Sequence, residues 1–130
     1  MPTIFSQIIQ GTIPSHKLYE DDRYYCFLDI RPISEGHSLV IPKVEVDYIF
    51  DLEDDLLSGM MPVAKKLARA LKHVVSCERV GILVAGLEVP HAHLHLVPIT
   101  SETQLSFEHA TPANQDDLAR LAETISAVLN

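Results

Sequence analysis

A chain of 130 residues has the size of one domain and is long enough to bury one hydrophobic core. The hydrophobic fraction of 47% is typical of globular proteins, and no apolar run reaches the roughly 18 residues that a membrane span requires. The formal net charge of −8 disfavours a nucleic-acid polymer as a partner, because binding many backbone phosphates requires a basic surface, but a small pocket can still bind a single nucleotide.

The start of the sequence and the two cysteines predict a cytoplasmic protein. Residues 1–7 contain no basic region ahead of a long apolar segment, so no secretory signal is predicted. Cys26 and Cys77 lie far apart and match no metal-binding or redox spacing. We interpret both as thiols in a reducing cytosol.

The first predicted element is a short helix over residues 3–10. Thr3 is a candidate N-cap and Gly11 is the stop. The apolar residues at helical spacing are Ile4, Phe5, Ile8 and Ile9.

Three strands are predicted next. Residues 17–20 and 23–29 flank a short turn, and residues 37–42 form the third strand. Successive side chains on a strand point to opposite faces, so Phe27 and Asp29 are predicted to share a face. An aromatic ring and a carboxylate would therefore lie side by side.

A helical region is predicted between residues 51 and 75. The acidic residues of 51–57 suit a helix start, and residues 61–75 have a strongly amphipathic spacing. Pro62 must either open this second stretch or kink it. We expect a short first helix followed by a long one.

The C-terminal part of the chain is predicted to contain two strands, a loop and a helix. Residues 79–85 and 91–98 are the strands, and residues 99–113 are loop-like. Thr111-Pro112 is a plausible cap and first-turn proline for the last helix. The apolar stripe of that helix consists of Leu118, Leu121, Ala122, Ile125 and Leu129.

These elements predict an α+β fold with an antiparallel sheet of about five strands. The long helix would pack on this sheet, and a C-terminal helix would complete the domain. Such a sheet can bury one face under helices and leave the other face for a ligand.

Three histidines alternate with apolar residues in the stretch Pro90-His91-Ala92-His93-Leu94-His95-Leu96-Val97-Pro98. In a strand, three such rings point to one face, and the apolar residues between them point to the other. Three titratable rings on one face form a poor core, so the pattern indicates chemistry. The more isolated histidines are interpreted as ordinary polar residues: His16, His73 and His109.

Two functions fit such a row of histidines, a metal site and covalent catalysis. Imidazole is the commonest metal ligand, but residues two apart on a strand are about 6.5–7 Å apart, and zinc ligands lie only about 2 Å from the ion. Three rings in a flat row would converge only with strain, and no matching carboxylate or cysteine stands out. Covalent catalysis needs a nucleophilic imidazole with assisting neighbours, and His93 has one on each side.

The stretch from His91 to Val97 resembles the His-x-His-x-His-x-x signature, with x apolar, of the histidine triad (HIT) superfamily. The resemblance covers about residues 5–98, and we expect a single HIT domain over residues 1–130, with a loop and helix in 99–130. The other segments that follow the usual HIT order are Phe5 with Ile8 and Ile9, Ile13-Pro14, Tyr19-Glu20-Asp21, Phe27-Leu28-Asp29-Ile30, Pro32, Gly36-His37 and Leu39-Val40-Ile41-Pro42-Lys43.

The resemblance implies a nucleotide hydrolase or nucleotidyl transferase that needs no cofactor. Such proteins cleave an α-phosphate linkage, in a phosphoramidate or a dinucleoside polyphosphate, through a nucleotidyl-histidine intermediate. By position, His93 would be the nucleophile, and His95 would lie beside the phosphate and the leaving group. His91 would fix the strand and ring orientation through a backbone contact, and His37 would support the triad from behind. The resemblance also implies a purine nucleotide or nucleotide conjugate as substrate and a homodimer.

The resemblance places a nucleoside pocket beside the triad. Asp29 matches the carboxylate that accepts hydrogen bonds from the ribose hydroxyls, and its position beside Phe27 favours a functional role, because a carboxylate there needs a polar partner. For Leu39, packing in the core explains the residue equally well. The apolar residues that match the walls around the base are Phe5, Ile13, Phe27, Ile30 and Leu39.

The residues before the triad depart from the family pattern. Many relatives carry Gly-Gln-Ser/Thr-Val there, whereas this chain has Gly86-Leu87-Glu88-Val89. We expect backbone N–H groups of Gly86 and Val89 to replace the missing phosphate contacts. A second hypothesis follows from the same departure: a nucleotide-binding regulatory module with little catalytic activity.

A structural zinc is not expected. Some relatives bind zinc through Cys-x-x-Cys, a later histidine and the first triad histidine. The corresponding positions here are Thr3, Ser6 and Glu45, together with His91. Hydroxyl groups are poor zinc ligands compared with thiolates.

Overall fold

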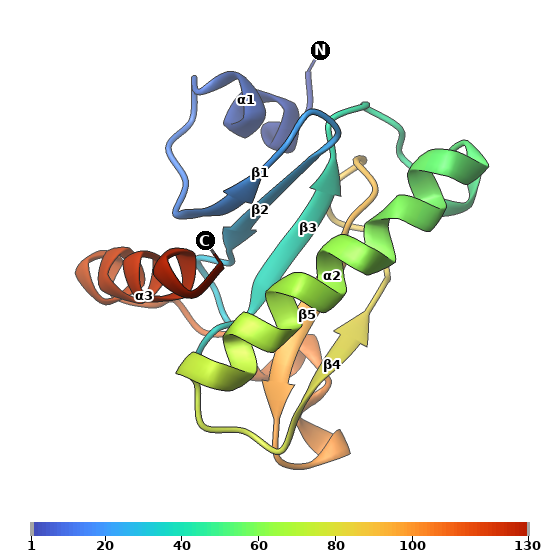
Figure 1. Ribbon diagram of the computed structural model, residues 1–130. Helices are drawn as coiled ribbons and strands as arrows, with labels where there is room; N and C mark the ends of the chain where they lie inside the picture. The colour runs from blue at the N-terminus through green and yellow to red at the C-terminus, as the bar shows by residue number, and fades with distance from the viewer. Residues whose placement is uncertain (1, 130) are drawn as a thin grey trace.

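Five strands form one antiparallel sheet in the computed structural model, which describes residues 2–129 (Figure 1). The strand order is β1-β2-β3-β5-β4, and every neighbouring pair is antiparallel. The expected α+β fold with about five strands is therefore confirmed. The strands are β1 (Lys17–Glu20), β2 (Tyr24–Leu28), β3 (Ser38–Pro42), β4 (Arg79–Leu83) and β5 (Leu94–Ile99).

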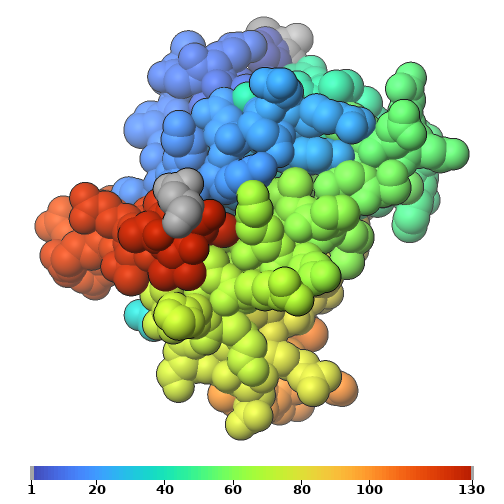
Figure 2. Space-filling view, viewed as in Figure 1, coloured from blue at the N-terminus to red at the C-terminus, as the bar shows by residue number. Residues whose placement is uncertain are grey.

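Two helices cover one face of the sheet, α2 (Asp54–Val74) and α3 (Gln115–Leu129). They also contact each other, and in Figure 2 the red atoms of α3 lie directly against the green atoms of α2. This face holds the larger core, to which the strands contribute residues such as Cys26, Val40 and Leu96. Within residues 2–129, no helix combines the length and the apolar character needed to cross a membrane.

The opposite face of the sheet packs against the short helix α1 (Ile4–Gln10). Thr3 caps this helix as predicted, because its side chain accepts a hydrogen bond from the N–H of Ser6, and Gly11 ends it with φ +84°. The smaller core on this face consists of Phe5, Ile8, Tyr25, Phe27, Leu39 and Ile41. The alternation of side chains along β2 and β3 assigns neighbouring residues to the two faces.

The expected division of the long helix by Pro62 is wrong. A 3-10 turn η1 (Ile49–Asp51) comes first, and α2 then continues through Pro62 without interruption. Proline removes the hydrogen bond that the carbonyl of Ser58 would accept. Both Ser58 and Pro62 are exposed, so water can replace the missing donor.

The start of the C-terminal helix also differs from the expectation. Helix α3 begins at Gln115, and the cap is Asn114, whose side chain accepts hydrogen bonds from the N–H groups of Asp116 and Asp117. Thr111-Pro112 belongs to the preceding segment. The segment expected as loop contains two 3-10 turns, η2 (Glu102–Gln104) and η3 (Phe107–His109).

The histidine strand begins later than expected, because β5 starts at Leu94. The β3–β5 register would place Pro42 opposite Ala92, and proline has no N–H for the ladder. The N–H of Ala92 instead donates to the carbonyl of Val46. The alternation still continues through this segment, since Ala92 and Leu94 are in the larger core.

A row of paired residues crosses the sheet at the level of the site. Phe27 pairs with Leu39, Leu39 pairs with His95, and His95 pairs with Leu83. Directly paired residues on neighbouring strands point to the same face. This register places Phe27 of β2 and His95 of β5 on the face of the sheet that α1 covers in part.

Candidate active site

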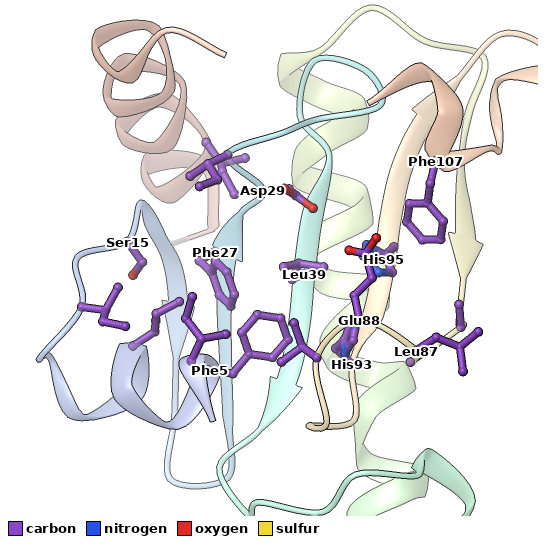
Figure 3. A pocket seen from close by; sticks show the side chains of 18 of the residues that line it. Phe5, Ser15, Phe27, Asp29, Leu39, Leu87, Glu88, His93, His95 and Phe107 are labelled. Atoms are coloured by element: carbon purple, nitrogen blue, oxygen red, sulfur yellow. The ribbon is translucent and has the colours of Figure 1, made fainter. Parts of the chain in front are cut away.

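A cavity of about 510 Å³ lies on the α1 side of the sheet (Figure 3). Its walls come from two stretches of the chain, before residue 40 and after residue 84. The predicted residues that line it are Phe5, Ile13, Phe27, Asp29, Ile30, Leu39, Gly86, Val89, His93 and His95. Leu39 is 4% exposed and belongs to the smaller core as well, so it both packs in the core and lines the cavity.

Several lining residues were not predicted from the sequence. They include Ile4, Ile8, Pro14, Ser15, Leu28, Ala85 and Phe107. Phe107 is the most distant in sequence, and its ring lies 4.9 Å from that of His95, edge to face. It is also the one aromatic residue of Phe, Tyr or Trp type within residues 99–113, a signal that could have identified it.

The contacts of His93 fix which of its nitrogens carries the proton. Its Nδ1 lies 2.6 Å from the carbonyl oxygen of His91, and only a protonated nitrogen can donate to a carbonyl. In the neutral ring, Nε2 therefore carries the free electron pair. The ring is held edge to face by Phe5, at 5.0 Å, and by His95, at 4.8 Å.

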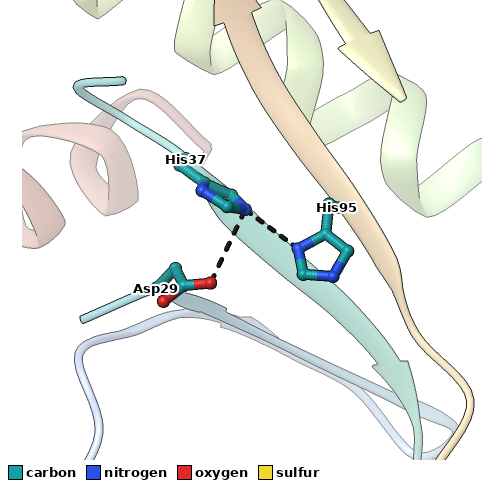
Figure 4. Close-up of side chains that lie close together, drawn as sticks. All are labelled: Asp29, His37 and His95. Carbon is teal, nitrogen blue, oxygen red and sulfur yellow. Dashed lines mark hydrogen bonds and ion pairs between the residues drawn. The ribbon is translucent and has the colours of Figure 1, made fainter. Parts of the chain in front are cut away.

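A chain of hydrogen bonds fixes His95 in the opposite way. The N–H of Ile33 donates to Nδ1 of His37, so the proton of the neutral His37 ring is on Nε2. This Nε2 lies 2.9 Å from Nδ1 of His95 and donates to it (Figure 4). The proton of His95 is then on Nε2. The two adjacent rings thus present a free electron pair, on His93, and an N–H donor, on His95.

Burial keeps these rings neutral. It lowers the pKa of His95 to about 3, and repulsion from the charged forms of His93 and His37 adds to the effect. Burial also lowers the pKa of His93, although its hydrogen bond to the His91 carbonyl and the charges of Asp29 and Glu88 act in the other direction. For His37, burial lowers the pKa against the opposing charge of Asp29. At pH 7 Nε2 of His93 is therefore unprotonated.

Asp29 lies just outside β2, which ends at Leu28 and not at residue 29 as expected, but it lines the same cavity as Phe27. Its Oδ1 accepts a hydrogen bond from the N–H of Arg31. Its Oδ2 lies 3.6 Å from Nε2 of His37. The carboxylate is partly exposed and retains acceptor capacity toward the cavity.

His91 is buried and does not line the cavity. Its Nε2 donates to the carbonyl of Pro42 at 2.9 Å, so its Nδ1 is an acceptor for the hydroxyl of Thr3, also at 2.9 Å. One carboxylate oxygen of Glu45 accepts hydrogen bonds from the backbone N–H of Thr3 and the hydroxyl of Ser6. Helix α1 is thereby attached to the first triad histidine.

The cluster of Thr3, Ser6, Glu45 and His91 occupies the positions at which the resemblance to the HIT superfamily implies zinc ligands in some members. The side chains do not fit zinc, because two hydroxyls replace the thiolates that the ion prefers. They also satisfy one another: hydrogen bonds from Ser6 and from the N–H of Thr3 lower the pKa of Glu45. The four groups form a connected hydrogen-bond network.

A second set of groups could hold a metal. Ligand atoms of Asp29, His37 and His95 lie within 4.8 Å of one another (Figure 4). Here the facing nitrogens of His37 and His95 share a hydrogen bond, which an ion between them would have to displace. The contacts present are those of an imidazole relay.

An antiparallel five-stranded sheet with the alternating His91, His93 and His95 at and just before its β5 strand, the last two lining an apolar cavity, has the features of the histidine triad class. Residues 10–102 match the family model of the HIT domain. The chain belongs to the HIT family.

Curated and solved relatives agree with this assignment. Adenosine 5′-monophosphoramidase HNT1 of Saccharomyces cerevisiae is 38% identical over 125 residues, which are 92% of this chain and 76% of the yeast protein. A Hit-like protein from Bartonella henselae superposes with a TM-score of 0.85 at 27% identity, covering 97% and 95% of the two chains. A zinc-bound histidine triad family protein from Mycobacterium smegmatis gives a TM-score of 0.83 at 30% identity, covering 97% and 91%.

Proposed function

We propose that this protein is a hydrolase or nucleotidyl transferase that cleaves an α-phosphate linkage of a purine nucleotide conjugate. The observation that carries the proposal is the opposite protonation of two adjacent rings. His93 presents an electron pair on Nε2, and His95 presents an N–H donor on its own Nε2. A nucleophile and a donor side by side are what displacement at phosphorus requires.

The reaction proceeds in two displacements at the α-phosphorus. Nε2 of His93 attacks, a P–N bond to histidine forms, and the bond to the leaving group breaks with its electron pair going to the leaving atom. That atom takes a proton supplied by solvent while His95 donates a hydrogen bond to it or to a phosphoryl oxygen. Water, or another acceptor, then attacks the phosphorus, releases a proton and restores the electron pair of His93.

The nucleoside would bind at the end of the cavity formed by Phe5, Ile13, Phe27, Ile30 and Leu39. Asp29 would accept hydrogen bonds from the ribose hydroxyls. Gly86 and Val89 line the cavity next to the histidines, and their N–H groups would contact the phosphate. The name of the yeast relative, an adenosine 5′-monophosphoramidase, supports an adenine nucleotide and a phosphoramidate bond.

Single-turnover experiments with an adenosine phosphoramidate and a dinucleoside polyphosphate test the proposal. We expect a nucleotidyl adduct on His93 of the wild type, detected by mass spectrometry of the quenched protein. His93→Ala should lose adduct and turnover but keep nucleotide affinity, whereas His109→Ala, which changes a histidine outside the cavity, should behave as wild type. Turnover that persists in His93→Ala would contradict the mechanism. Tight binding without any adduct in the wild type would instead support a nucleotide-binding regulatory module.

We also propose that the protein is a homodimer formed through the edge of its sheet. Strand β4 is at the edge, and its free side offers backbone groups for pairing with a second copy. Ile82 and Val84 are 41% and 46% exposed on and just beyond this strand. A two-fold axis beside β4 would pair the two sheets and cover both side chains.

We also propose that the protein is cytoplasmic. We further propose that residues 1–130 form a single HIT domain. Cys26 and Cys77 are both free thiols, which is ordinary in a reducing compartment. The contacts of α3 with α2 and β1 support its membership of the same domain as the residues of the family match.

A further inference from the structure

The cavity has an unusual charge balance for a nucleotide site. Among the described residues that line it there are two carboxylates, Asp29 and Glu88, and no lysine or arginine. The lining histidines add no fixed positive charge, because they are neutral at pH 7. A leaving group that carries several phosphate charges would meet no cation here.

The two carboxylates approach the histidines from different parts of the chain. Asp29 follows β2, and its carboxylate lies within 4.8 Å of ring nitrogens of His37 and His95, whereas Glu88 lies in front of the His93 and His95 rings (Figure 3). Beyond the histidines, on the side away from Phe27, Figure 3 shows Phe107. An α-phosphorus placed at His93, with its nucleoside toward Phe27, would leave the region of Glu88 and Phe107 for its leaving group.

We propose that Glu88 and Phe107 form a leaving-group subsite that selects conjugates of cationic amines and rejects polyphosphate leaving groups. This inference rests on the proposed nucleotidyl transfer to His93. A carboxylate pairs with an ammonium group, and an aromatic ring attracts the same cation through its face. The first displacement is the one proposed above. A P–N bond to His93 forms, the P–N bond to the amine breaks, and the amine leaves with the electron pair and takes a proton from solvent.

The charge of Glu88 should change the preference among leaving groups only moderately, because Glu88 is exposed. Water and salt screen a charge at such a position, so the preference should be about tenfold rather than absolute, and it should shrink as ionic strength rises. The charge of Glu88 nevertheless reaches the site, since it acts on the pKa of His93.

Three adenosine phosphoramidates of matched length test the subsite, with leaving amines that end in an ammonium, a methyl or a carboxylate group. We expect the wild type to have a kcat/KM about tenfold higher for the ammonium-ended than for the carboxylate-ended substrate. Glu88→Gln should reduce this ratio toward one, and Glu88→Lys should invert it. Phe107→Leu should lower it about threefold. Glu108→Gln, which removes a charge beside Phe107 but outside the cavity lining, should keep the wild-type ratio.

Equal kcat/KM values for the charged substrates in the wild type would overturn the subsite, as would a ratio that survives in Glu88→Gln. A wild type that turns over all three substrates equally leaves the proposed function intact and removes only the subsite. A wild type that forms no adduct with the methyl-ended substrate overturns the proposed function and the subsite together.

Discussion

A single backbone N–H group determines the protonation of two buried histidine rings. The amide of Ile33 donates to Nδ1 of His37, so the proton of the neutral His37 ring is on Nε2. This Nε2–H group donates to Nδ1 of His95. A backbone amide cannot exchange its donor role for an acceptor role, whereas a hydroxyl or a water molecule could. The loop before β3 therefore sets the direction of the relay that ends in the cavity.

Substitutions at His37 test this relay. His37→Leu removes the donor to Nδ1 of His95, so the His95 proton can move to Nδ1 and the cavity loses its N–H group. We expect adduct formation to slow about 10²-fold for an amine leaving group. It should slow much less for a nitrophenolate leaving group, which departs without assistance. Rates are measured by rapid quench.

His37→Gln is the matched variant, since its side-chain amide can donate to His95. It should recover most of the rate that His37→Leu loses with the amine. An equal loss for both leaving groups, or no recovery in His37→Gln, would mean that His37 acts only by filling space behind the triad.

Within helix α2, Gly59 is explained by packing rather than by flexibility. The hydroxyl of Tyr24 donates to the carbonyl of Leu56, and a Cβ at position 59 would lie 2.1 Å from that hydroxyl. Glycine in a helix normally costs about 1 kcal/mol relative to alanine. Here the missing side chain leaves the space in which a buried tyrosine from β2 reaches the helix backbone.

Gly59→Ala should therefore lower the free energy of unfolding by about 1–3 kcal/mol instead of raising it. Urea unfolding measures the change. In a Tyr24→Phe background the penalty should shrink, because the hydroxyl is gone, although Tyr24→Phe itself costs about 1 kcal/mol. Ser58→Ala, at an exposed neighbouring position, should not destabilise the protein. A stabilised Gly59→Ala protein would refute this account.

Sequence patterns predicted the elements whose signals are local. Helix α1 has its cap and stop within one turn of its ends, and the alternation predicted for residues 23–29 assigned Phe27 and Asp29 to the side of the sheet that holds the cavity. The start of β5 was missed because it depends on a proline in another strand, Pro42. Continuous α2 was missed because a proline is tolerated where its partner carbonyl faces water, and that exposure is a tertiary property.

The site shows the same division. The alternating histidines and Phe27 of β2 carry their own signal, and the structure brings His93, His95 and Phe27 to one cavity. Phe107 carries none of comparable strength, since its position beside His95 depends on the path of residues 99–113 after β5. The protonation of His95 could not be foreseen either, because the amide of Ile33 that sets it belongs to an irregular loop.

At the scale of the whole molecule, the free edge of β4 should decide the oligomeric state. Ile82→Lys places a charge on this edge and should shift the proposed dimer to a monomer, by an amount that sedimentation equilibrium can quantify. Val128→Lys is the matched control, because Val128 is 42% exposed on α3, against 41% for Ile82. It should leave the dimer intact. A wild type that is monomeric at every concentration, or an Ile82→Lys protein that still dimerises, would contradict the interface.

The walls of the cavity leave out the middle of the chain, from residue 40 to residue 84. This segment contains α2 and β4, and α2 packs on the face of the sheet turned away from the histidines. The segment still supports the site from outside the cavity, because the carbonyl of Pro42 accepts a hydrogen bond from His91 and Glu45 holds helix α1. A substitution at Pro42 or Glu45 could therefore move His91 or α1 without changing any residue that lines the cavity.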